Sequence, residues 1–152
     1  MEVFEAEIED IPELCDLLGY LFEHEVEFKP DISLQSCGLQ KILENNELGA
    51  VLILREKDKA VGMVTLLFTI STALGGMVAL LEDMVVIPSE RGKGYGSRLL
   101  RAAMDYANRK ECKRITLLTD DTNIKAQKFY RHHGFAHSSM HPMRYLIISD
   151  NS

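Results

Sequence analysis

The spacing of apolar side chains predicts alternating strands and helices. Period-two alternation is typical of half-buried strands, whereas apolar residues three and four positions apart are typical of amphipathic helices. The predicted elements, in chain order, are strand 3–8, helices 11–23 and 33–44, strands 50–55, 60–71 and 78–87, helix 97–109, strand 114–119, helix 124–133 and one or two closing strands within 135–148. One mixed α/β sheet with helices packed on its faces follows from this order.

Local signals support several of these boundaries. The charged tip at residues 56–59 joins two apolar runs and predicts a hairpin. We expect Asp10 to cap the first helix, Ser33 to cap the second and Gly134 to end the last. Neither repeats nor linkers interrupt the chain, so residues 1–152 are predicted to form a single domain.

Residues 80–100, LLEDMVVIPSERGKGYGSRLL, carry the strongest chemical signal. An apolar strand enters a glycine-rich basic turn, and helical spacing begins after it. The amides of such a loop and of the first helical turn converge, and the helix dipole favours negative charge there. Arg91 and Lys93 add positive charge. The stretch therefore predicts a site for a phosphate-bearing molecule.

Composition and charge restrict the partners. With 46% hydrophobic and 26% charged residues, the chain resembles an ordinary soluble domain. The formal net charge of −6 argues against nucleic acid as the main partner. No apolar run approaches the roughly 20 residues of a membrane span, and the acidic first ten residues do not resemble a signal peptide. Three scattered cysteines indicate a reduced, cytoplasmic protein.

Two common nucleotide motifs do not fit the glycine loop. Ser97 stands where GxGxxG requires its last glycine, and the acidic residue expected about 20 positions later falls at a helix end. A Walker A loop would end in GK[ST], whereas this loop ends in Gly96-Ser97. The phosphate-bearing molecule is therefore predicted to be held by another kind of loop.

The loop resembles the [Q/R]-x-x-G-x-[G/A] signature of the GNAT N-acetyltransferase superfamily, with Arg91, Gly94 and Gly96 at the defining positions. Further on, Asn123, Tyr130 and the pair Gly134-Phe135 resemble the N-x(6)-Y-x(3)-G-F pattern of the same family. The order of elements also agrees over almost the whole chain. The resemblance implies a mostly antiparallel sheet that splays beside the strand before the loop.

The resemblance further implies acetyl-CoA as co-substrate and acetyl transfer to an amine. The pyrophosphate would bind loop amides, and the pantetheine arm would pair with the preceding strand like an extra strand. Asn123 would bond this arm, Tyr130 would lie near the thioester sulfur, and a homodimer is expected. The residues so implied in cofactor binding are Met84, Val85, Val86, Arg91, Gly92, Lys93, Gly94, Tyr95, Gly96, Ser97 and Asn123.

Two kinds of side chain suit the chemistry of amine acetylation. An alkylammonium with a pKa near 10.4 needs a base or a water relay at neutral pH, and Glu82 is the first candidate. Asp83 points to the opposite face of a regular strand, although a bulge would change that. Tyr130 can give a proton or a hydrogen bond to the leaving thiolate. Glu82 and Tyr130 are therefore the predicted catalytic residues.

Other reactive side chains are not expected to act. The neighbours His132 and His133 point about 100° apart on a helix, and neither they nor His137 and His141 complete a metal-ligand set. Cys112 has no base beside it in the sequence, so it is predicted to be a packed thiol. No metal is expected.

The acceptor is the open half of the prediction. Acidic residues gather after the first helix, at Glu23, Glu25, Glu27 and Asp31. Residues 68–83 resemble the diamine and thialysine acetyltransferase branch, with Ala73-Leu74 in place of its tryptophan. A small primary amine, such as a polyamine or an amino-acid side chain, is the first choice. Alternatives are a protein lysine or N-terminal acetyltransferase and a non-catalytic acyl-CoA sensor.

Overall fold

The computed structural model describes residues 1–23 and 31–148 of the protein. The chain forms two compact units, Met1–Leu118 and Thr119–Ser152, each held together by its own contacts. None of the helices in the described residues is long and apolar enough to span a membrane. The expectation of a single domain stays a prediction.

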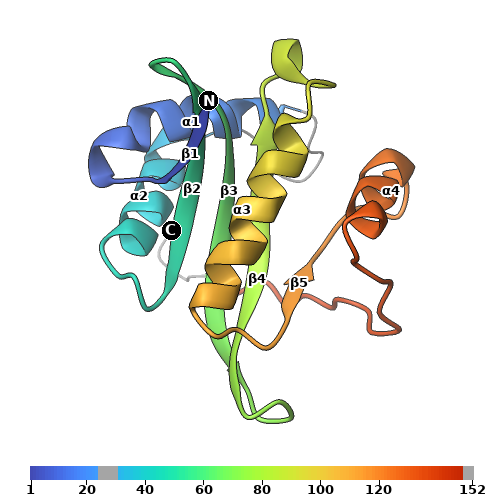
Figure 1. Ribbon diagram of the computed structural model, residues 1–152. Helices are drawn as coiled ribbons and strands as arrows, with labels where there is room; N and C mark the ends of the chain where they lie inside the picture. The colour runs from blue at the N-terminus through green and yellow to red at the C-terminus, as the bar shows by residue number, and fades with distance from the viewer. Residues whose placement is uncertain (24–30, 149–152) are drawn as a thin grey trace. The chain divides into compact units, whose positions relative to one another are not determined.

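A five-stranded sheet forms the centre of the first unit (Figure 1), and its strands are β1 (Glu2–Glu5), β2 (Gly49–Glu56), β3 (Lys59–Ser71), β4 (Gly76–Val86) and β5 (Ile115–Leu117). Spatial order equals chain order. The first four strands pair antiparallel, and β5 joins β4 in parallel. The predicted mixed, mostly antiparallel sheet is therefore confirmed.

Helices cover both faces of this sheet, as predicted. The helices of the first unit are α1 (Ile11–Phe22), α2 (Ile32–Leu43) and α3 (Tyr95–Arg109), with single 3-10 turns at Ile8–Asp10 and Pro88–Glu90. Gly49 backs onto Ile42 of α2, whereas Gly62 backs onto Leu99 of α3. Gly62 lies opposite Leu54 of β2, and paired residues face the same side of a sheet. Leu54 is five positions after Gly49, so the two residues face opposite sides of the sheet, and α2 and α3 therefore lie on opposite faces. Figure 1 shows α3 crossing the front of the sheet.

The core fills both interfaces between sheet and helices, and its largest fully buried side chains include Leu14, Leu17, Ile53, Leu54, Met63, Leu66, Leu99 and Leu100. Strands β2 and β3 are buried on both faces over most of their length, which explains their continuous apolar sequences. On α3 the buried stripe consists of Leu99, Leu100, Ala103, Tyr106 and Ala107. The core thus holds β3 and β4 rigidly against α1 and α3.

Two predicted helix caps are wrong. The side chain of Asp10 accepts a hydrogen bond from the backbone N–H of Glu7 (2.8 Å) and pairs with Arg55 (2.7 Å), so it does not cap α1. Asp31, rather than Ser33, caps α2 by accepting from the Leu34 N–H at 3.1 Å. In both cases several polar residues stand near the helix start, and their competing partners decide which one caps.

The second unit contains α4 (Ile124–His132), and both of its ends follow from local chemistry. Asn123 caps the start by accepting a hydrogen bond from the Ala126 N–H at 3.1 Å. Gly134 follows the helix with φ +96°, a left-handed conformation that favours glycine. The predicted stop at Gly134 is therefore confirmed.

The predicted closing strands at residues 135–148 are wrong, because the structure has no strand there. The apolar side chains of Met143 and residues 145–148 are 81–95% exposed. An apolar sequence gives a segment strand propensity, but a strand also needs a backbone partner for its N–H and C=O groups. In the described part of the chain, no strand of the sheet pairs with this segment.

Candidate active site

Strand β4 loses its β5 partner halfway along. The parallel pairing covers only residues 79–81 of β4, opposite Ile115–Leu117 of β5, whereas β3 pairs with β4 as far as Val86. In the described residues no other strand covers this side of β4 after Leu81. The edge at Met84, Val85 and Val86 is therefore not covered by a strand, and an extended ligand can add there like a strand, although the Val86 carbonyl accepts a hydrogen bond from Arg91.

A β-bulge interrupts β4 at the start of this free edge. Thr65 of β3 lies opposite Glu82 and Met63 lies opposite Val85, so β4 carries one more residue than β3 between these pairs. Asp83 takes φ +50° there, a conformation that aspartate tolerates better than most residues. Because the bulge breaks the alternation of a regular strand, Asp83 need not point away from the face of Glu82.

The two carboxylates at the bulge have different surroundings. Glu82 is exposed, whereas Asp83 is only partly accessible. Burial raises the pKa of Asp83 to about 6, and the nearby negative charge of Glu82 adds to the rise, while the Thr65 hydroxyl opposes it. Asp83 therefore changes its protonation state close to neutral pH, as a general base does.

The glycine loop after β4 is shaped by two left-handed glycines. Gly92 and Gly94 have φ of +81° and +82°, and a Cβ at either position would meet open space. The requirement for glycine is therefore conformational. Arg98 donates its N–H to the Gly94 carbonyl at 3.2 Å, so the amides of the preceding first turn of α3 have no helical acceptor. Such a turn can bind an anion.

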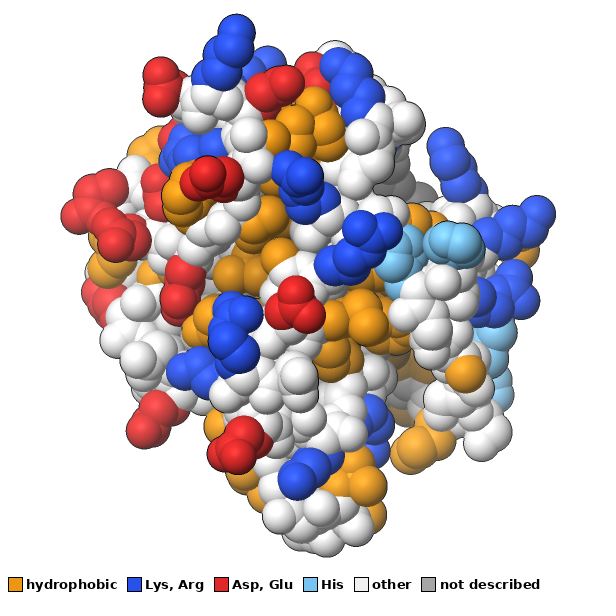
Figure 2. All heavy atoms as spheres, viewed as in Figure 1, with side chains coloured by type: hydrophobic (Ala, Val, Ile, Leu, Met, Phe, Trp, Pro, Cys, Tyr) orange, Lys and Arg blue, Asp and Glu red, His pale blue; other side chains and the backbone are white. Residues whose placement is uncertain are grey.

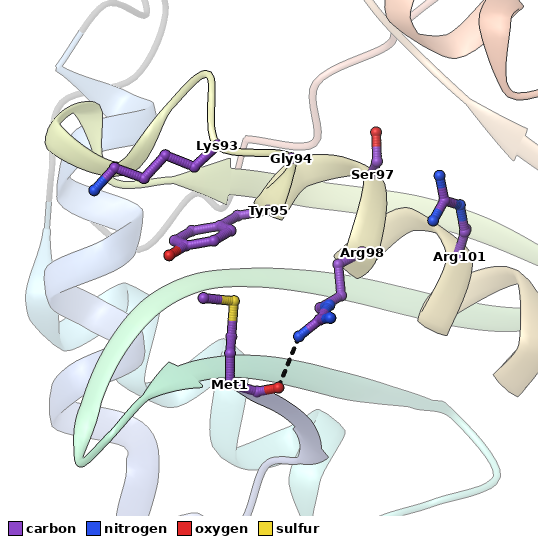
Figure 3. Close-up of a pocket in the computed structure, with 7 residues that line it drawn as sticks. All are labelled: Met1, Lys93, Gly94, Tyr95, Ser97, Arg98 and Arg101. Carbon is purple, nitrogen blue, oxygen red and sulfur yellow. Dashed lines mark hydrogen bonds between the residues drawn. The ribbon is translucent and has the colours of Figure 1, made fainter.

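A cavity of about 410 Å³ opens beside this turn (Figure 3), and its lining residues are Met1, Lys93, Gly94, Tyr95, Ser97, Arg98 and Arg101. The lining has three cationic side chains and no carboxylate, although the whole chain has a net charge of −6. Sequence reasoning missed Arg98 and Arg101. Their spacing from Gly94, four and seven positions, places them on one side of α3 and could have revealed them.

The loop cations are held by neighbouring groups. Lys93 forms an ion pair with Glu90 at 2.7 Å, which raises the pKa of Lys93. Arg91 donates through Nε to the Val86 carbonyl at 3.0 Å, at the end of β4. The Tyr95 hydroxyl donates to Glu56 at 3.2 Å. These contacts hold the loop in place beside the strand.

Asn123 and Tyr130 lie in the second unit. The Oδ1 atom of Asn123 is engaged in the helix cap, whereas its amide N–H groups are not used there. The ring of Tyr130 has edge contacts with Phe129 and Phe135, at centroid distances of 5.2 and 5.8 Å. Burial raises the pKa of Tyr130, so the phenol keeps its proton at neutral pH.

Other reactive groups do not assemble into a site. No three histidine, cysteine or acidic side chains of residues 1–23 and 31–148 come together as metal ligands. His133 Nδ1 lies 2.9 Å from the Phe129 carbonyl. Burial raises the pKa of Cys112, which reduces its thiolate fraction. The expected absence of a metal stays a prediction.

The predicted acidic region near the acceptor is only partly described. Glu25 and Glu27 lie outside the described residues, while Glu23 is exposed and Asp31 is the cap of α2. Acidic side chains also gather at the edge of the molecule where α1 and α2 lie (Figure 2). The first unit thus combines an acidic side with a basic loop.

Comparisons with known proteins agree with this geometry. The model of the acetyltransferase (GNAT) family matches residues 11–135. An uncharacterized N-acetyltransferase of Bacillus subtilis, YhfO, is 36% identical over 105 residues, which cover 69% of this chain and 70% of that protein. Streptothricin acetyltransferase A of the same organism is 37% identical over 67 residues, 44% of this chain and 39% of that protein.

The fold has close counterparts among solved structures. A possible acetyltransferase from Clostridium difficile superposes with a TM-score of 0.87 at 17% identity, covering 97% of this chain and 98% of that one. At this identity the likeness shows a shared fold. Together with the family match over residues 11–135, it means that the chain belongs to the acetyltransferase (GNAT) family and is an N-acetyltransferase.

Proposed function

We propose that the protein transfers an acetyl group from acetyl-CoA to a primary amine of a small molecule, such as a polyamine or an amino acid. Transfer would be direct, with both substrates bound at once. One observation carries this proposal: the uncovered edge of β4 leads, through the 3-10 turn at Pro88–Glu90, into the glycine loop and the free amides of α3. An extended arm that ends in phosphates fits this arrangement.

The residues of the first unit fit acetyl-CoA, which supplies an activated acetyl thioester. The backbone at Met84–Val86 would bind the pantetheine arm, and the amides of residues 92–97 would bind the pyrophosphate. Arg98 and Arg101 would add positive charge from the wall of the cavity. Asn123 would donate an amide N–H to the arm, because its Oδ1 is already used by the helix cap.

The two carboxylates of the bulge would divide the work on the acceptor. Less than about one part in a thousand of an alkylamine is neutral at pH 7. Glu82, which is exposed, would attract the ammonium form. Asp83, with its pKa of about 6, would accept the proton directly or through water. Glu82 as the base remains the alternative, and separate Gln and Asn variants distinguish the two.

Tyr130 would supply the proton or hydrogen bond that the leaving thiolate needs. Its pKa is raised by burial, so the phenol stays protonated across the working pH range. A thiolate whose parent pKa is about 8.5 requires only a weak acid. Tyr130 would therefore act on the leaving thiolate, whereas the bulge carboxylates would act on the attacking amine.

A small acceptor is favoured over a protein. The bulge carboxylates suit a cationic amine, and one relative is named for streptothricin as its acceptor. An acceptor of the kind used by the diamine and thialysine acetyltransferase branch would also be a small amine. Protein lysine or N-terminal acetylation, and an acyl-CoA sensor without turnover, are the alternatives.

Thiol release from acetyl-CoA, measured with panels of diamines, amino acids and peptides, tests the acceptor class. We expect turnover with small primary amines and little turnover with peptides. The reverse order would favour a protein acetyltransferase. Tight binding of acetyl-CoA without turnover on any amine would favour the sensor. A reaction without amine serves as the control for hydrolysis.

We also propose one acetyltransferase domain, a homodimer and a cytoplasmic location. The family match spans both compact units, which supports a single functional domain. The three cysteines are free, which suits a reducing compartment. Sedimentation equilibrium would test the dimer.

A further inference from the structure

Among the described residues, Thr65 is the one polar residue that is buried with the apolar core, and only 1% of its surface is exposed. Its Oγ1 atom has no hydrogen-bond partner in the described part of the chain. A buried hydroxyl that is left unpaired destabilises the fold, because it loses its hydrogen bonds to water. Its neighbours on β3, including Met63, Val64 and Leu66, are buried and apolar. The hydroxyl is therefore an exception that calls for a function.

The position of Thr65 points to that function. It lies on β3 directly opposite Glu82, at the place where the bulge of β4 begins. The Thr65 hydroxyl acts on the carboxyl of Asp83 and lowers its pKa. The hydrogen of a threonine hydroxyl rotates about the Cβ–Oγ1 bond and can be donated in one hydrogen bond. The strand pairing thus brings the Thr65 hydroxyl, a hydrogen-bond donor, to the bulge that carries the half-buried carboxylate.

We propose that Thr65 is a positioning residue for Asp83, whose ionised carboxylate accepts a hydrogen bond from the Thr65 hydroxyl and is thereby held at the bulge in its proton-accepting form. This inference rests on the proposed role of Asp83 as the base. The bond satisfies the buried hydroxyl and offsets part of the desolvation of the carboxylate.

Other charged groups do not replace Thr65 in this role. Glu82 is the charge that acts on Asp83, and it disfavours the ionised form. On α1, which packs against β3 and β4, Glu13 is bound to Arg55 and Asp16 is exposed. Arg98 and Arg101, the cations in the first half of α3, are exposed, and so is Thr116 of β5. Among the described residues, Thr65 is the group that stabilises the ionised form of Asp83.

The test compares Thr65→Val, which has the same shape without the hydroxyl, with Thr65→Ser, which keeps the hydroxyl. The first measurement is the titration of the Asp83 carboxyl carbon by NMR, with Asp83→Asn identifying its resonance. We expect the midpoint to rise by about one pH unit in Thr65→Val and to stay near the wild-type value in Thr65→Ser. An unchanged midpoint in Thr65→Val would overturn the proposal.

The second measurement is the pH profile of kcat/KM with an active amine. The acidic limb should move upward in Thr65→Val by the same amount, lowering kcat/KM about tenfold below the limb and little at pH 8. A purely structural role would lower Tm without moving this limb. Because the NMR titration needs no substrate, it separates failure of this inference from failure of the proposed acetyl transfer. Thr65→Ala replaces Thr65→Val if the valine variant does not fold.

Discussion

Asp83 combines three features that seldom occur together in a strand. It has a positive φ of +50°, it forms a bulge, and its carboxyl is buried enough to bring the pKa to about 6. Such backbone strain costs about 1–3 kcal/mol and concentrates at functional sites. A stability cost at this residue is therefore expected, together with a gain in reactivity.

Replacing Asp83 by Asn should reveal a second cost, that of burying the ionised carboxylate, which depends on pH. The folded-state pKa of about 6 exceeds the ordinary value of 3.8, so the folded protein binds more protons and loses stability as the pH rises between these values. The neutral Asn, which also tolerates positive φ, avoids the loss. Asp83→Asn should be more stable than wild type by up to about 3 kcal/mol above pH 6.

Thermal unfolding of both proteins from pH 4 to pH 8 measures this difference. The stability gain of Asp83→Asn should shrink as the pH falls from 6 towards 3.8, because the folded carboxyl becomes protonated while the unfolded one is still partly ionised, and it should be less than about 1 kcal/mol at pH 4. A gain that is independent of pH would contradict the assigned cause. Turnover of the variant should be low throughout.

Tyr130→Phe should lower turnover while acetyl-CoA binding remains. The substitution removes only the hydroxyl, and the ring contacts with Phe129 and Phe135 can persist. We expect kcat to fall by about 10²-fold or more, as for loss of a general acid. Calorimetric titration with acetyl-CoA and steady-state rates measure the two effects. Unchanged kcat would remove the acid role of Tyr130.

At the scale of elements, the continuous segment of β4, the glycine loop and α3 shapes the proposed site. The sequence alone predicted this segment, because strand, glycine turn and helix each have their own local signal. Gly92 and Gly94 adopt left-handed conformations in which a side chain is disfavoured. The loop thus sets the direction in which the amides of α3 point.

Substituting these glycines should damage the loop for conformational reasons. Gly92→Ala and Gly94→Ala should each lower stability by about 1 kcal/mol and raise KM for acetyl-CoA. Gly38→Ala is the matched control, because Gly38 lies in α2 with open space around its Cβ position. It should raise stability by about 0.5–1 kcal/mol. Chemical denaturation and initial rates measure these effects. Loop variants as stable as Gly38→Ala would contradict this explanation.

Elements with local signals were predictable, and those that depend on distant partners were not. The bulge at Asp83 leaves no trace in the sequence, since Asp can adopt positive φ without a glycine. The apolar residues 143–148 have the composition of a strand, but no ladder forms in the structure. Thr65 looks like any strand threonine until the pairing of β3 and β4 places it opposite the bulge.

At the scale of the whole molecule, charge is unevenly distributed. The chain has a net charge of −6, yet the cavity beside α3 is lined by Lys93, Arg98 and Arg101 without a carboxylate. An anionic co-substrate would be attracted to this cavity and repelled elsewhere. Salt screens such an effect, because the Debye length is about 8 Å at physiological ionic strength.

Binding of acetyl-CoA should therefore weaken with salt. We expect KM for acetyl-CoA to rise roughly 2- to 5-fold between low and high ionic strength. The double variant Arg98→Gln/Arg101→Gln should have a KM about tenfold higher, with a weaker salt dependence. Arg109→Gln, at the other end of α3, is the control and should behave like wild type. Equal salt dependence in all three proteins would exclude a role of the cavity.

The most direct test of the account is to follow both products of one reaction, free CoA by its thiol and the acceptor by mass spectrometry. With wild-type protein, acetyl-CoA and a small diamine or amino acid, we predict one N-acetylated amine for each CoA released, and almost none of either with Asp83→Asn. Release of CoA without any acetylated amine, or bound acetyl-CoA that is never consumed, would contradict the proposed acetyl transfer to a small amine.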